Sequence, residues 1–149
     1  VPATRAHAFL SGADFAANRL TKNGHRIAAP RTLVYYGTHE LAHIRTYELT
    51  GPVAFHLLPE WVQEGLADYV ALGAPDAAGW AFAVSDQPVT VQMMRLHGAA
   101  YPRKRALVAW MIEHAGWSLD TLLATRLSEA EALAKMQAEW AVASGADDA

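Results

Sequence analysis

The chain has 149 residues, of which 52% are hydrophobic and 18% charged, and its formal net charge is −3. This length and composition predict one globular domain over residues 1–149, because two domains with separate cores need a longer chain. The acidic balance argues against a nucleic-acid partner, whose binding depends on a basic face. Cysteine is absent, so disulfides are excluded and any bound metal must be held by imidazole and carboxylate groups.

No stretch approaches about eighteen uninterrupted apolar residues, so we expect no membrane span and a soluble protein. The first residues, VPATRAHAFL, lack the basic start and apolar core of a signal peptide. A signal peptide removed ahead of Val1 would imply a secreted or periplasmic location, and the sequence leaves the location unknown.

Three helices are expected in the first half of the chain. Apolar residues at helical spacing predict a helix over residues 4–21. A second helix begins near Pro30 and runs until TGP at residues 50–52. A third helix covers EWVQEGLADYVAL, residues 60–72, and is closed by Gly73.

The second half is expected to combine a small hairpin with further helices. WAFAV at residues 80–84 and VTVQM at residues 89–93 have the composition of two short strands around the turn SDQP. The helices are expected over residues 102–114, from Ser118 through LDTLLAT, and from the capping box SEAE to about residue 143. Residues 144–149 are expected to form a disordered tail. The predicted fold class is mainly α, with α+β as the alternative through a small β hairpin or sheet.

The stretch THELAH, residues 38–43, places two histidines four positions apart inside the second predicted helix. Residues four apart on a helix share one face, with Cβ atoms about 5–6 Å apart, so His39 and His43 can aim their imidazoles at one point. Zinc accepts nitrogen ligands, and a catalytic zinc site takes three protein ligands and keeps one position open. Glu40, one step around the helix, can reach a water at that position, which makes it the candidate general base.

The third predicted helix supplies acidic candidates for the remaining ligand. Glu64 is the preferred one, and Asp68 lies one helical turn beyond it on the same face. Glu60 lies on that face too. It follows Pro59 in the first helical turn, where the helix dipole favours a carboxylate, so we interpret Glu60 as a helix-start residue.

HELAH followed by WVQEGLADY resembles the gluzincin metallopeptidases, the group that includes thermolysin and aminopeptidase N, over about residues 33–72. The resemblance implies a zincin-like catalytic domain in which His39, His43 and Glu64 bind Zn²⁺ and Glu40 polarises the catalytic water. It also implies that Asp68 holds the first histidine through a hydrogen bond, which fixes the imidazole tautomer.

The segment AYPRKRALVAWMIEHAGWSLDTLL, from residue 100, is similar to the C-terminal helical part of small bacterial gluzincin-like domains. A tyrosine at this place assists catalysis in such domains, and the resemblance therefore implies that Tyr101 stabilises the oxyanion. His97, four positions earlier, is the alternative donor.

These patterns predict a zinc-dependent peptidase that hydrolyses peptide bonds of a peptide or protein substrate, with Glu40 as general base. The alternative is a non-catalytic, zinc-stabilised module that binds a peptide or protein, and a metal-free helical interaction domain is a further one. Two imidazoles and one carboxylate suit several divalent ions, so the native metal stays open, as do the oligomeric state and the cleavage preference.

Overall fold

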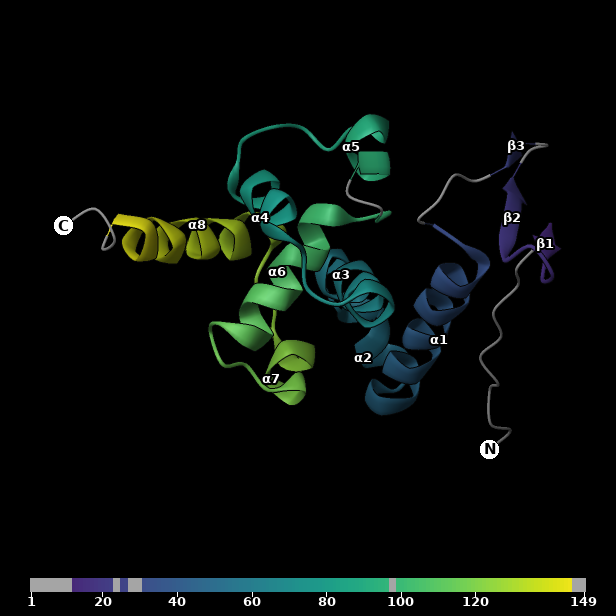
Figure 1. Cartoon of the computed structure of the whole chain (residues 1–149). Helices are drawn as coiled ribbons and strands as arrows, with labels where there is room; N and C mark the ends of the chain where they lie inside the picture. The colour runs from purple at the N-terminus through teal and green to yellow at the C-terminus, as the bar shows by residue number, and fades with distance from the viewer. Residues whose placement is uncertain (1–11, 23–24, 27–30, 97–98, 146–149) are drawn as a thin grey trace.

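The computed structural model describes residues 12–22, 25–26, 31–96 and 99–145. Over these residues the chain is mainly helical, with a small antiparallel sheet near its N-terminal end (Figure 1). The predicted fold class, mainly α with a small sheet, is confirmed. The sheet lies elsewhere in the sequence than the prediction put it.

The element bounds follow the chain from this sheet to the last helix. The strands are β1 (Ala13–Asp14), β2 (Arg19–Lys22) and β3 (His25–Arg26), and β2 pairs antiparallel with both others. The helices are α1 (Leu33–Thr50), α2 (Pro52–Leu57), α3 (Glu60–Leu72), α4 (Ala77–Val84), α5 (Val91–Leu96), α6 (Pro102–Glu113), α7 (Leu119–Ala124) and α8 (Glu129–Gly145).

The helix predicted over residues 4–21 is wrong where the structure describes this segment, and residues 1–11 lie outside the described part. A turn over residues 15–18 joins β1 to β2, with φ of 50° at Asn18, and Gly12, just before β1, has φ of 72°. The Asp14 side chain accepts a hydrogen bond from the backbone N–H of Ala17 at 3.0 Å. Asp and Asn favour such local turns, and this turn chemistry outweighs the helical spacing of the neighbouring apolar residues.

The same turn caps the start of α1. The Asn18 side chain accepts from the backbone N–H of Val34 at 2.9 Å, and the Thr32 hydroxyl accepts from that of Tyr35 at 3.2 Å. The first N–H groups of a helix have no partner within it, so these acceptors fix where α1 begins. The helix ends at Gly51, whose φ of 78° suits glycine.

Helix α3 lies at the centre and packs against α1 on one side and α6 on the other (Figure 1). The contact with α6 requires Gly65, because a Cβ there would lie 2.3 Å from the carbonyl oxygen of Lys104. Fully buried side chains fill the core that α3 and α6 share with α7 and α8: Trp61, Val62, Leu107, Val108, Met111, Leu122 and Met136.

The strands predicted at residues 80–84 and 89–93 are also wrong, since these residues lie in or next to α4 and α5. The Asp76 side chain accepts from the N–H of Gly79 at 2.8 Å and caps α4. The Thr90 hydroxyl accepts from the N–H of Met93 at 3.2 Å and caps α5. Short apolar runs fit a strand or a buried helix equally well, and here the capping residues favour helices.

The predicted capping box at the start of α8 is present. The Glu131 carboxylate accepts from the backbone N–H of Ser128 at 2.8 Å, and the Ser128 hydroxyl accepts from that of Glu131 at 3.3 Å. Helix α8 extends to Gly145, two residues into the expected tail, and residues 146–149 lie outside the described part. Among the described helices, none has the length and apolar character to cross a membrane.

Candidate metal centre

The three predicted ligands come together where α1 packs against α3. The Glu64 Oε2 atom lies 3.2 Å from His39 Nε2 and 3.6 Å from His43 Nε2, and the two Nε2 atoms are 3.1 Å apart. His39 is 5% exposed, while His43 and Glu64 are half-buried. The cluster is therefore open to solvent on the side of His43 and Glu64.

The spacing of these donor atoms fits one divalent cation. A tetrahedral ion with ligands at about 2.0–2.2 Å has ligand–ligand edges of about 3.3 Å. The three observed separations, 3.1, 3.2 and 3.6 Å, lie close to that edge length. Two imidazole nitrogens and one carboxylate oxygen suit zinc, and they also suit other divalent transition metals.

Asp68 orients the first of these histidines. Its side chain is fully buried, and Oδ1 lies 2.9 Å from His39 Nδ1. The Nδ1–H donates to this carboxylate, so that Nε2 is the nitrogen that faces His43 and Glu64. The hydrogen bond predicted between Asp68 and the first histidine is therefore present.

Tyr35 is not among the site residues predicted from the sequence. Its hydroxyl donates to Asp68 and accepts from the backbone N–H of Ala100 at 3.0 Å, and its side chain is buried. The available signal was its position one helical turn before His39, on the same face of α1. Through Tyr35 and Asp68, α1 and α3 both hold the segment that precedes α6.

Neighbouring charges shift the pKa values of two predicted ligands. Burial lowers the pKa of His39, but the hydrogen bonds to Asp68 and Glu64 and their negative charges outweigh it and raise the pKa to about 9. Burial raises the pKa of Glu64, but hydrogen bonds from His39 and His43 outweigh it and lower the pKa to about 2. Glu64 is thus a carboxylate at neutral pH, and a cation that binds here displaces the proton of the buried imidazole.

Tyr101 also reaches the centre, as predicted. Its backbone N–H donates to Asp68 Oδ2 at 2.7 Å, and its ring stacks on that of His39 with centroids 6.1 Å apart and 18° between the planes. Burial, followed by the negative charges of Glu64, Glu60 and Asp68, raises the pKa of its hydroxyl. The phenol is therefore protonated at neutral pH and can donate a hydrogen bond.

The remaining predicted residues have different surroundings. Glu40 is half-buried on α1, next to His39 and one helical turn before His43. Glu60 is exposed in the first turn of α3 and lies 2.6 Å from Lys104 Nζ, which agrees with its interpretation as a helix-start residue. His97 lies outside the residues that the structure describes.

Comparison with protein-family models, with curated proteins and with solved structures finds no match for this chain. What the centre does must therefore be inferred from its own residues.

Proposed function

We propose that the chain is a zinc-dependent peptidase that hydrolyses peptide bonds in a peptide or protein substrate. The observation that carries the proposal is the convergence of His39, His43 and Glu64 at the edge lengths of a tetrahedral ion. The resemblance of HELAH and WVQEGLADY to the gluzincin metallopeptidases supports the same reaction.

In this proposal two imidazoles and one carboxylate hold the ion, and Asp68 keeps the His39 ring in the tautomer that binds it. A bound zinc ion supplies Lewis-acid chemistry, lowering the pKa of a water molecule towards about 7 and polarising the scissile carbonyl. The half-buried positions of His43 and Glu64 leave a side from which the peptide enters.

Glu40 acts as the general base. Its carboxylate takes a proton from the attacking water and later delivers that proton to the leaving amine. The Tyr101 hydroxyl, protonated and next to Glu64, donates a hydrogen bond to the oxyanion that develops on the former carbonyl oxygen. Loss of such a donor costs about 3 kcal/mol of transition-state stabilisation in other enzymes.

The substitution Glu40→Gln tests this assignment. It keeps the shape of the side chain and removes the base, so zinc content should stay unchanged while peptide hydrolysis falls about 100-fold or more. The matched control is Glu48→Gln, on the same helix, where the carboxylate is exposed and pairs only locally with Arg45 at 3.2 Å. Zinc analysis and a fluorogenic peptide assay on both variants give the answer, and full activity in Glu40→Gln would refute the role of the base.

The same measurements separate the proposal from its two alternatives. Zinc bound by the parent chain without any turnover supports a non-catalytic, zinc-stabilised binding module. A chelator that changes neither the melting temperature nor the activity supports a metal-free interaction domain.

A further inference from the structure

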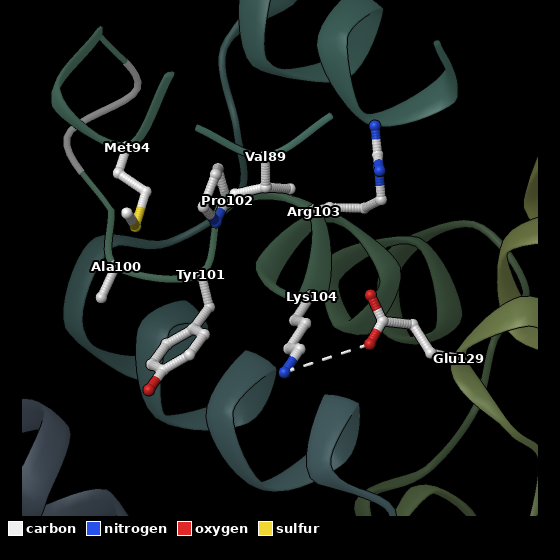
Figure 2. Close-up of a pocket in the computed structure, with 8 residues that line it drawn as sticks. All are labelled: Val89, Met94, Ala100, Tyr101, Pro102, Arg103, Lys104 and Glu129. Atoms are coloured by element: carbon white, nitrogen blue, oxygen red, sulfur yellow. Dashed lines mark ion pairs between the residues drawn. The ribbon is translucent and has the colours of Figure 1, made fainter. Parts of the chain in front are cut away.

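The second predicted ligand, His43, is held differently from the other groups of the centre. His39 is oriented by the buried Asp68, which accepts a hydrogen bond from its Nδ1–H. The ring of Tyr101 has the ammonium group of Lys104 over it, 5.0 Å from the ring centroid (Figure 2). His43 meets His39 through Nε2, and its Nδ1 has no hydrogen-bond partner among the residues that the structure describes.

An imidazole without such a hydrogen bond needs another contact to fix its direction. The outer torsion of a histidine side chain, χ2, has a broad range, and a rotated His43 ring would move Nε2 away from the point where the ligand atoms meet. Loss of a group that orients a metal-binding imidazole costs about 10–100-fold in metal affinity. The groups that pack against the His43 ring therefore decide how well the centre is prepared for an ion.

Helix α2 supplies such a group. The ring of Phe55 lies 6.4 Å from that of His43, centroid to centroid, with 87° between the planes. It lies 5.7 Å from the ring of Tyr47, with 68° between the planes. Tyr47 follows His43 by one turn of α1, so Phe55 spans two side chains of one helix face. Aromatic rings favour such edge-to-face arrangements at centroid separations of about 4.5–7 Å.

A sharp reversal after α1 brings Phe55 to this place. Gly51, with φ of 78°, donates to the carbonyl oxygen of Tyr47 at 2.8 Å and accepts from the backbone N–H of Phe55 at 3.0 Å. Phe55 is half-buried and packs against the core, whereas Val53 and Leu57 of the same helix are 73% and 61% exposed. Phe55 is thus the large apolar side chain that α2 turns towards the rest of the protein.

We propose that Phe55 is a positioning residue for the second zinc ligand, and that α2 holds the His43 ring in the orientation in which Nε2 faces the other ligand atoms. The inference rests on the proposed metal centre and adds to it a residue that contributes no ligand atom. If Phe55 only anchored α2 to the core, its loss would lower stability without a specific effect on zinc binding.

The parent chain tests the contact without any substitution. In the metal-free chain, at one fixed pH, we expect nuclear Overhauser effects between the ring protons of Phe55 and those of His43. Phe55→Leu should shift the ring signals of His43 and leave those of His114, which stacks on Trp110, unchanged. Absence of the contact between the Phe55 and His43 rings in the parent would overturn the proposal.

Zinc affinity, measured by competition with a chelating dye, tests the consequence. Phe55→Leu removes the ring and keeps an apolar side chain, so the affinity should fall about tenfold. Phe55→Tyr keeps the ring and should bind zinc within about threefold of the parent. The control for lost stability is Trp80→Leu, since Trp80 is also half-buried and meets Trp110 edge-to-face, with centroids 6.3 Å apart and 75° between the planes. Trp80→Leu should lower Tm and keep the zinc affinity.

These variants separate positioning from packing. A Phe55→Leu chain that binds zinc as tightly as the parent overturns the proposal, and so does an equal loss of affinity in Phe55→Leu and Trp80→Leu. If Phe55→Leu does not fold, Phe55→Met takes its place with the same expected loss, because its long, flexible side chain fills the space without providing a ring.

The same measurements separate this inference from the proposed function. Zinc binding that weakens in Phe55→Leu as expected, with no peptide hydrolysis by the parent, keeps the positioning role and refutes the peptidase. Hydrolysis by the parent, with unchanged zinc affinity in Phe55→Leu, keeps the peptidase and refutes the positioning role. A parent chain that binds no zinc refutes both.

Discussion

The two sides of α3 make contacts of opposite chemistry. Towards α6 the contact is apolar and very close, with Gly65 against the backbone of Lys104 and Val62 fully buried in the core. Towards α1 it is polar, with Glu64 and Asp68 facing imidazole rings. Apolar burial stabilises a fold directly, whereas a buried carboxylate costs several kcal/mol unless hydrogen bonds compensate it.

This difference indicates which contact maintains the fold and which serves the site. The fully buried Asp68 is compensated by the Tyr35 hydroxyl, the His39 ring and the backbone N–H of Tyr101. Such an arrangement adds little stability over an apolar contact of the same size, but it fixes the direction of an imidazole. Substitutions on the two sides of α3 should therefore separate stability from metal binding.

The largest expected effect is on the α6 side. Gly65→Val places its Cβ 2.3 Å from the Lys104 carbonyl oxygen, so α3 and α6 must move apart. We expect the free energy of unfolding to fall by about 3 kcal/mol, measured by urea denaturation. Val70→Leu, at a position of α3 that is 53% exposed, is the control and should change it by less than about 0.5 kcal/mol. Equal stability of Gly65→Val and the parent would mean that the two helices do not approach as closely as described.

On the α1 side we expect a substitution to affect zinc affinity more than stability. Asp68→Asn keeps the side-chain shape, but its amide group meets donors where the carboxylate accepted hydrogen bonds. Zinc affinity should fall about 10–100-fold, measured by competition with a chelating dye. The free energy of unfolding of the metal-free chain should fall by about 2 kcal/mol, less than for Gly65→Val. A Gly65→Val chain that loses zinc affinity to the same extent while still folded would break the distinction between the two sides.

The sequence predicted that His39, His43 and Glu64 lie together, because the spacing within each helix puts the candidate side chains on one face of α1 and one face of α3. His39 and His43 need only the period of one helix, and Asp68 needs only the same face as Glu64. Tyr35 was not predicted as a site residue, because its contact with Ala100 depends on how a segment 65 residues away folds back over α1. The hairpin at residues 12–22 was not predicted for another reason. Apolar residues at helical spacing and turn-forming residues occur in the same stretch, and neither pattern alone shows whether a helix or a turn forms there.

The smallest expected effect concerns that missed residue. Tyr35→Phe removes one donor to Asp68 and leaves the N–H of Ala100 without its acceptor, while His39 and Tyr101 still donate to the carboxylate. The free energy of unfolding should fall by about 1 kcal/mol, with a smaller loss of zinc affinity than in Asp68→Asn. Because this segment carries Tyr101, the proposed oxyanion donor, its release should lower kcat of the proposed peptidase more than it changes KM. Tyr36→Phe removes a hydroxyl from the next position of α1 and is the matched control. Identical stability and kcat in Tyr35→Phe and Tyr36→Phe would show that the link between α1 and the segment before α6 has no role.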